Sequence, residues 1–201
     1  QMTSQSKTGY DRVAKVFDYL RGGDMKRWAT PQQSLFEHMS GKVLYVGTGT
    51  GQEIVNFPPG LNITAIDLSI KMLEKAKPRA DAYDGKIRLK TMDAHQLAFA
   101  DNSFDTVVAV CVFCTVTDPV QGLKEIKRVL KPNGKLIMFE HVMSRNPVYG
   151  LILRIMSIFT VAIEGTHLDR DTVDNIHKAG FTVEKEQNVY LDIVKALIAK
   201  P

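Results

Sequence analysis

Cysteine, net charge and long uncharged stretches are all scarce in this sequence, and each shortage excludes a class of protein. Cys111 and Cys114 are the only cysteines among 201 residues, so the chain has no disulfide framework and we expect a reducing compartment. The net charge of +4 is too small to indicate nucleic-acid binding, although it leaves room for peripheral contact with an anionic membrane. The uncharged run between Asp105 and Asp118 is shorter than the roughly 20 residues that a spanning helix needs. The polar start is unlike a signal peptide, so we expect a cytoplasmic protein.

The overall composition is that of a globular domain. Hydrophobic residues make up 44% and charged residues 24% of the chain, which excludes disordered and collagen-like proteins. No repeat or low-complexity tract is present. A length of 201 residues suits one domain with a substantial core. We therefore expect one domain over residues 1–201 and leave its oligomeric state open.

Strand-like and helix-like segments alternate through the middle of the chain. Short apolar segments are separated by segments with helical spacing or with helix caps such as Ser69 and Asp118. The predicted strands cover residues 42–46, 62–66, 86–91, 104–112 and 135–140, and the predicted helices between them cover 52–56, 70–80 and 119–130. This order predicts parallel strands in one sheet with helices on both faces.

The N-terminal part of the chain is predicted to be helical. Residues 10–28 have apolar side chains at helical spacing, but a pair of glycines weakens the pattern. Residues 32–39 predict a second, short helix after Pro31.

The C-terminal part departs from the alternation in another way. A predicted helix over 172–179 precedes predicted strands over 181–186 and 190–199, joined by a tight connection near Asn188. A hairpin at the end of a parallel sheet implies one antiparallel strand.

A glycine-rich stretch follows the first predicted strand. Gly47, Gly49 and Gly51 alternate with threonines there, and Asp67 ends the next predicted strand. In an open parallel sheet, ligands bind at the carboxyl ends of the strands, where glycines allow close approach and an acid can bind ribose hydroxyls. The spacing is GxGxG rather than the GxGxxG of dinucleotide-binding loops. A tight structural turn beside an ordinary helix-start carboxylate is the alternative explanation.

Four short motifs follow one another along the middle of the chain. They are residues 43–51 (VLYVGTGTG), 66–69 (IDLS), 92–94 (MDA) and 130–135 (LKPNGK). Together they resemble the class I S-adenosylmethionine-dependent methyltransferases, over about residues 10–140. The resemblance implies an α/β fold, a Rossmann-like three-layer αβα sandwich with a seven-stranded, mostly parallel sheet and an antiparallel last strand. The cofactor it implies is S-adenosyl-L-methionine, without a metal.

The resemblance also implies which residues bind the cofactor. The matching positions are Gly47, Thr48, Gly49, Gly51, Asp67, Leu68, Asp93, Ala94 and Cys111. The loop residues would lie beneath the methionine part of the cofactor. Asp67 would bind the ribose hydroxyls and Leu68 would pack on the adenine. Asp93 and Ala94 match the position that contacts the adenine amino group, and Cys111 matches the segment between cofactor and acceptor.

Two tyrosines near the start are candidates for the catalytic site. Residues 9–18 (GYDRVAKVFD) resemble the YDxxAxxYD pattern of quinone and phospholipid methyltransferases, with Phe17 in place of the second tyrosine. Tyr10 is the expected lid contact to the cofactor, and Tyr19 is a second candidate, because aromatic faces attract a sulfonium. An amphipathic helix that packs on the sheet is the alternative role for both.

Histidines and cysteines complete the candidate list. His141 ends the fifth predicted strand, where it can orient or deprotonate an acceptor. His167 and Asp169 can line the same opening, and a structural or surface role is the alternative for all three. The CxxC pair at 111–114 has no partner pair for zinc and ends a strand, so we do not expect metal or redox chemistry.

The stretch at residues 147–164 is apolar on nearly all sides of a predicted helix. We expect it to belong to an acceptor-side insert over residues 143–170, opposite an N-terminal helical lid over residues 1–40. Its side chains either line an apolar acceptor pocket and dock on anionic lipid, or complete the core as a cap helix.

One functional prediction follows, with alternatives. We predict methyl transfer from S-adenosylmethionine to an apolar or lipid-like acceptor, with the amine of a phospholipid headgroup as first choice. Residues 139–142 (FEHV) with the apolar helix that follows are similar to soluble bacterial phosphatidylethanolamine N-methyltransferases and also to thiol methyltransferases. A quinone carbon or a small thiol is the alternative acceptor. An NAD(P)-dependent oxidoreductase and a non-catalytic cofactor-binding protein are the alternatives from other classes.

Overall fold

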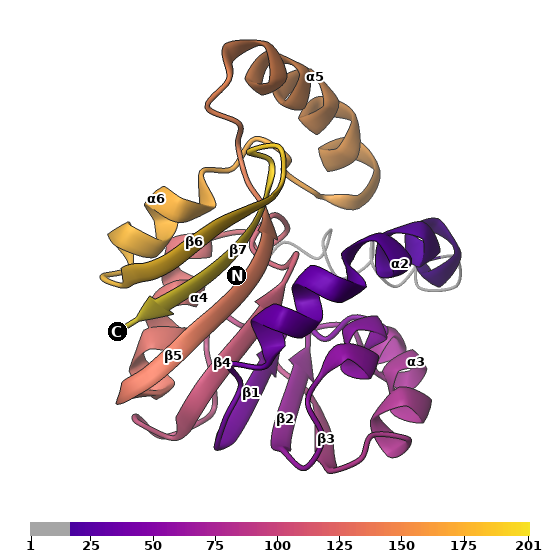
Figure 1. The fold of residues 1–201 in the computed structure, drawn as a ribbon, viewed down its shortest axis with the longest axis vertical. Coiled ribbons are helices and arrows are strands. Elements are labelled where there is room, and N and C mark those ends of the chain that lie inside the picture. Colours follow the sequence, from indigo (N-terminus) through magenta and orange to yellow (C-terminus); the bar gives the residue numbers. More distant parts are fainter. Residues whose placement is uncertain (1–16) are drawn as a thin grey trace.

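A seven-stranded sheet forms the centre of the molecule (Figure 1). The computed structural model describes the backbone of residues 17–201 and the side chains of residues 27–163 and 165–201. The strand order is β3-β2-β1-β4-β5-β7-β6, in which β7 runs antiparallel to both of its neighbours and the other pairs are parallel. The strands are β1 (Lys42–Val46), β2 (Asn62–Asp67), β3 (Lys86–Thr91), β4 (Phe104–Val110), β5 (Leu130–His141), β6 (Thr182–Tyr190) and β7 (Val194–Lys200). The predicted fold class is confirmed, including the antiparallel last strand.

Helices cover both faces of the sheet and make three layers (Figure 1). One face carries α2 (Phe17–Phe36), the 3-10 helix η1 (Gln52–Asn56) and α3 (Ile70–Asp81), and the other carries α4 (Pro119–Val129) and α6 (Thr172–Lys178). Helix α5 (Pro147–Glu164) stands apart, beyond the carboxyl ends of the parallel strands (Figure 1). No helix in the described part of the chain is long and apolar enough to cross a membrane.

Alternate residues of the central strand β1 are buried on opposite faces of the sheet. Leu44 and Val46 pack into the cluster beneath α4 and α6. Val43 and Tyr45 pack into the cluster beneath α2, η1 and α3. Because successive side chains of a strand point to opposite faces, a strand that is covered on both sides is a continuous apolar run.

Helix α2 is continuous, so the predicted division into helices over 10–28 and 32–39 is wrong. The helix runs through both glycines and Pro31. A proline inside a helix costs about 3 kcal/mol, because it removes a hydrogen bond and crowds the preceding turn. Leu35 and Phe36 in the last turn are buried against the sheet, and this burial offsets the cost.

Two strands near the centre of the sheet have ends that differ from the prediction. β4 ends at Val110 rather than at residue 112, because Cys111 adopts a left-handed backbone conformation with φ +51°. β5 begins at Leu130 rather than at residue 135, because Leu130 pairs with Phe104 on the far side of a register shift.

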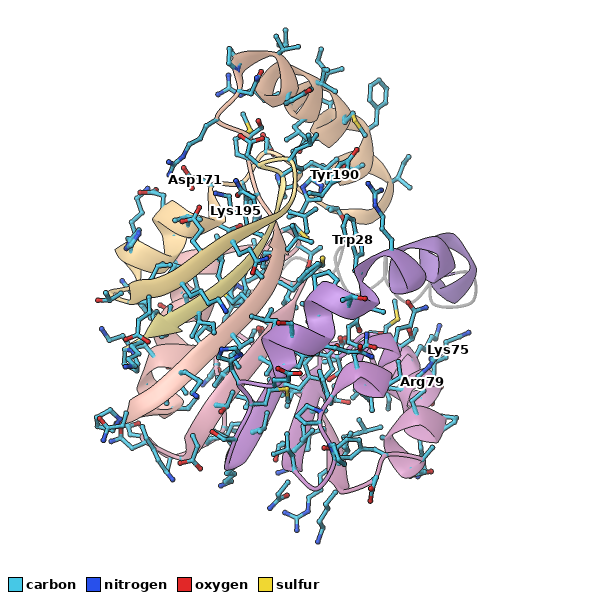
Figure 2. All side chains as sticks on the ribbon, viewed as in Figure 1. Trp28, Lys75, Arg79, Asp171, Tyr190 and Lys195 are labelled. Carbon is cyan, nitrogen blue, oxygen red and sulfur yellow. The ribbon has the colours of Figure 1, made fainter. Side chains whose placement is uncertain are left out.

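The hairpin turn between β6 and β7 also lies later than predicted. The antiparallel ladder continues past Asn188 as far as the pair Tyr190–Val194. The turn therefore comprises residues 191–193 rather than a connection near Asn188. This change places Tyr190 at the same end of the sheet as α5 (Figure 2).

Candidate functional site

The loops that follow β1, β2, β3 and β4 meet at one edge of the sheet. These strands are parallel neighbours in the order β3-β2-β1-β4, so their carboxyl ends lie side by side. The order of the strands reverses between β1 and β4. In open α/β sheets ligands bind at such a switch point, and here it lies at the end of the molecule that carries α5 (Figure 1).

The glycine loop after β1 needs glycine for two different reasons. Gly47, Gly49 and Gly51 all have positive φ, at +65°, +55° and +73°, a region that residues with a Cβ rarely adopt. A Cβ on Gly47 would lie 2.4 Å from a methyl group of Val112, so this position also lacks space. Within the described part of the chain, a Cβ on Gly49 would meet no atom within 4 Å. The backbone at Gly49 therefore borders open space in which a ligand can approach it.

Hydrogen bonds hold this loop against the end of β2. The backbone N–H and the hydroxyl of Thr48 both donate to the carbonyl oxygen of Ile66, at 3.0 and 3.1 Å. The carboxylate of Asp67 accepts one hydrogen bond from the Gly49 N–H and one from the Ser69 N–H, each at 2.8 Å. Bonds to two separate backbone groups fix the orientation of the Asp67 carboxylate beside the glycine loop.

The loop after β3 carries a second oriented carboxylate. Asp93 Oδ1 accepts hydrogen bonds from the backbone N–H of His95 at 2.9 Å and from its Nδ1 at 2.7 Å. His95 Nε2 faces the backbone N–H of Asp118 at 3.1 Å. Because a backbone N–H can only donate, Nε2 is the acceptor, and the ring proton is on Nδ1. His95 therefore links Asp93 to the first residues before α4 and is more than an ordinary loop residue.

Glu140 shapes the loop after β4, a role that the sequence analysis missed. The side chain is fully buried, and its Oε1 accepts hydrogen bonds from the backbone N–H groups of Val112 and Phe113 at 2.9 and 3.3 Å. These bonds stabilise the turn that the left-handed Cys111 begins. The available sequence indication was an acid directly after the apolar run 136–139, at the end of a predicted strand.

Arg170 braces the same loop from the segment that follows α5. Its Nη1 donates to the carbonyl oxygen of Phe113 at 2.9 Å and to that of Val116. The backbone N–H of His167 donates to the carbonyl oxygen of Cys114 at 2.8 Å. Burial lowers the pKa of Arg170 from its ordinary value. The end of β4 and the segment after α5 are thus joined by hydrogen bonds. No separate sequence pattern indicates the role of Arg170.

The structure brings the expected cofactor-binding residues together. They come from the loops after β1, β2, β3 and β4, all at the switch-point edge: Gly47, Thr48, Gly49, Gly51, Asp67, Leu68, Asp93, Ala94 and Cys111. Thr48 is buried and holds the loop on β2 through its hydroxyl, whereas Asp67, Leu68 and Asp93 are half-buried.

The structure describes the side chains of only some of the predicted catalytic residues. Tyr10 lies outside the described residues, and Tyr19 belongs to the described backbone of α2 without a described side chain. His141 is half-buried at the end of β5, opposite Val194 of β7. His167 Nδ1 lies 3.8 Å from Asp169 Oδ1, and burial together with Arg170 lowers the pKa of His167.

Similarity to known proteins decides the family. A family model described as a methyltransferase domain matches residues 44–138. The ubiquinone/menaquinone biosynthesis C-methyltransferase UbiE of Cereibacter sphaeroides is 30% identical over 213 residues, which cover 92% of this chain and 85% of the relative. The chain belongs to the class I S-adenosylmethionine-dependent methyltransferases. The family predicted from the four motifs is confirmed.

Other relatives of this methyltransferase differ in the acceptors for which they are named. The thiol S-methyltransferase TMT1B of Rattus norvegicus is 36% identical over 70% of this chain. The phosphatidylethanolamine N-methyltransferase of Cereibacter sphaeroides is 31% identical over 58% of this chain. The matches span 59% and 65% of the lengths of these two relatives.

A solved structure supports the same fold along nearly the whole chain. An S-adenosylmethionine-dependent methyltransferase from Thermotoga maritima superposes with a TM-score of 0.70 at 22% identity, covering 96% of this chain and 98% of the other. The geometry fits the cofactor of the family, because Gly49 leaves room for it and Asp67 and Asp93 are oriented beside that room. Among the described residues, no cluster of three or more metal-ligating side chains is present.

Proposed function

We propose that this methyltransferase transfers the methyl group of S-adenosylmethionine to an apolar or lipid-like acceptor. The observation that carries the proposal is the convergence of Gly49, Asp67 and Asp93 at the switch point, next to the loop braced by the segment after α5. The first choice of acceptor is the amine of a phospholipid headgroup. A quinone carbon and a small thiol are the alternatives.

The protein's task in this reaction is mainly positioning. When bound, S-adenosylmethionine supplies an electrophilic methyl group on a sulfonium, and its transfer leaves a neutral thioether. Alignment of two reactants can lower a barrier by several kcal/mol, and by about 10 kcal/mol in the best cases. Asp67, oriented by two backbone N–H groups, would accept hydrogen bonds from the ribose hydroxyls. Asp93, held by His95, would accept a hydrogen bond from the adenine amino group.

The proposed acceptor side is apolar. The loop after β4 begins with Val112 and Phe113, which are buried in the core beneath α4, and the segment after β5 leads into α5, in which Arg154 is the one charged residue among residues 147–163. Among the relatives, one is named for ubiquinone and menaquinone, one for phosphatidylethanolamine and one for a thiol. Two of these three names refer to lipids, which supports a lipid-like acceptor.

An amine acceptor must lose its proton before it can attack the methyl group. His141 is the proposed base, since it ends β5 beside the strand that carries the acceptor-side loop. Tyr10 and Tyr19 are the proposed aromatic contacts to the sulfonium. A thiolate or an activated quinol carbon would depend less on His141.

The test is transfer of a labelled methyl group from S-adenosylmethionine to three acceptors offered separately. These are vesicles that contain phosphatidylethanolamine, a demethylated quinol in detergent, and a small thiol. We expect labelled phosphatidylethanolamine, and loss of the label with Asp67→Asn. Labelling of the quinol or thiol alone would replace the first choice of acceptor. No labelling, together with no binding of S-adenosylhomocysteine, would overturn the proposed function.

A further inference from the structure

Helix α5 turns polar side chains toward the protein and apolar side chains toward solvent, which is the reverse of the usual arrangement. Along the side that faces the protein, Gly150, Leu153 and Ser157 are buried and Thr160 is half-buried, at the spacing of one helical stripe. Ser157 donates to Asp169 Oδ1 at 2.7 Å, and the Thr160 hydroxyl donates to the carbonyl oxygen of Thr166. The helix is thus attached to the protein largely through polar groups.

The opposite side of α5 is apolar and exposed. Ile158, Phe159 and Ile163 are 69%, 64% and 75% exposed. The other exposed large apolar residues of this helix are Val148, Tyr149, Leu151, Ile152, Ile155, Met156 and Val161. A helix on the surface of a globular protein normally turns its apolar side inward. Apolar patches of this kind mark contacts with a partner or a membrane, and Figure 2 shows that α5, with its side chains, forms one end of the molecule.

Charge identifies the kind of partner. Residues 142–163 contain no Asp or Glu, whereas Arg145 and Arg154 are both exposed. At the same end of the molecule, Tyr190 at the end of β6 and Leu191 in the β6–β7 turn are 42% and 48% exposed. A helix region that is apolar, carries two arginines and has no carboxylate over residues 142–163 suits an interface that is apolar inside and anionic at its surface, as a lipid bilayer is. The nearby carboxylate of Asp192 accepts hydrogen bonds from the Ser144 hydroxyl and the Arg145 N–H.

Both ends of α5 are tied firmly to the protein. Before the helix, Asp192 in the β6–β7 turn accepts hydrogen bonds from the Ser144 hydroxyl at 2.7 Å and from the Arg145 N–H at 2.8 Å. After the helix, the bond from His167 N–H to the Cys114 carbonyl oxygen connects it to the loop after β4. A surface that binds α5 would therefore also fix the position of the loop after β4 relative to that surface.

We propose that α5 lies in the interface of a membrane that contains anionic lipid, with its outward side among the acyl chains. The inference deepens the proposed function, because a lipid-like acceptor would then reach the site from the bilayer. It rests on the proposed function for that advantage alone, and the docking of α5 can be tested separately. The 18-residue helix is about 27 Å long at 1.5 Å per residue. Lying along the surface, it presents its exposed side chains to the lipid.

Sedimentation with vesicles tests the inference with the full chain. Phosphatidylcholine vesicles are compared with vesicles that also contain phosphatidylglycerol, at low and at high salt. We expect binding to the anionic vesicles that weakens as salt rises. Ile158→Asp should lower binding at least tenfold. The matched control is Val55→Asp, since Val55 is 76% exposed on η1 and should leave binding within twofold of the parent chain. Urea unfolding confirms that each variant is folded.

Each outcome has one meaning. Binding that Ile158→Asp loses and Val55→Asp keeps supports the inference. No binding to anionic vesicles at low salt, or equal binding by both variants, overturns it. A dimer in light scattering that Ile158→Asp dissociates, without vesicle binding, overturns it in favour of a second copy of this chain. Vesicle binding without methyl transfer to any acceptor would overturn the proposed function and leave the docking of α5 standing.

Discussion

Gly49→Ala offers the sharpest test of the cofactor site, because the chain provides matched controls. Gly49 and Gly60 both have positive φ, at +55° and +82°, and a Cβ at either position would meet no atom of the described residues within 4 Å. Alanine in the left-handed region costs about 1–2 kcal/mol. Both variants should therefore lose that amount of unfolding free energy in urea. Gly60 precedes β2, at the opposite edge of the sheet from the site.

The two variants should differ in cofactor binding. A methyl group on Gly49 occupies the open space at the switch point, whereas one on Gly60 projects away from the site. We expect calorimetry to give at least about a tenfold weaker affinity for S-adenosylhomocysteine with Gly49→Ala, which corresponds to about 1.4 kcal/mol. Gly60→Ala should bind like the parent chain.

Gly47→Ala is a third variant for comparison, with a larger expected loss of unfolding free energy. Its Cβ would lie 2.4 Å from Val112 in addition to the unfavourable φ. Overpacking of this kind costs about 1–3 kcal/mol, so this variant should be the least stable of the three. If Gly49→Ala and Gly60→Ala bound S-adenosylhomocysteine equally well, the space beside Gly49 would not be the cofactor site and the reasoning would be refuted.

Three further predictions concern carboxylates. Asp67→Asn should weaken S-adenosylhomocysteine binding at least about tenfold in calorimetry, because charge-assisted hydrogen bonds become neutral; unchanged binding would separate Asp67 from the ribose. Glu140→Gln should lower the unfolding free energy in urea by about 1–3 kcal/mol, because the buried acceptor of the Val112 N–H loses its charge; an unaltered urea midpoint would contradict that role. The hydrogen bond from Ser144 holds the pKa of Asp192 below its ordinary value. The Asp192 carboxylate therefore contributes stability above about pH 4 that is lost as pH falls through its lowered pKa. Urea unfolding from pH 6 to pH 3 should show a smaller acid-side loss in Asp192→Asn, and equal losses would argue against this contribution.

The cofactor half of the site could be predicted because its indications are local. Gly47, Gly49 and Gly51 directly follow an apolar strand, and Asp67 ends the next one. Parallel strands in consecutive order place these residues at one edge without further information. The cap at Ser69, which accepts a hydrogen bond from the Met72 N–H, is equally local and was predicted correctly.

The acceptor half depends on contacts between distant parts of the chain. Glu140 and Arg170 act on the loop after β4 from positions about 30 and 60 residues away in sequence, and no local pattern marks such pairs. The continuity of α2 through Pro31 has the same origin, since the burial of Phe36 against the sheet outweighs local propensity.

Helix α5 shows most clearly what the sequence determines by itself and what the tertiary structure decides. Its sequence alone determined that residues 147–164 form a helix, because Asn146 caps it, Pro147 begins it and Gly165 ends it. Its apolar composition left two placements open, inside the core or against something apolar outside. Only the tertiary structure decided between them, because the hydrogen bonds of Ser157 and Thr160 turn the polar stripe toward the protein and leave the apolar side exposed. The direction in which a helix faces is set by its neighbours in space, and a helix that is apolar nearly all round does not carry that direction in its own sequence.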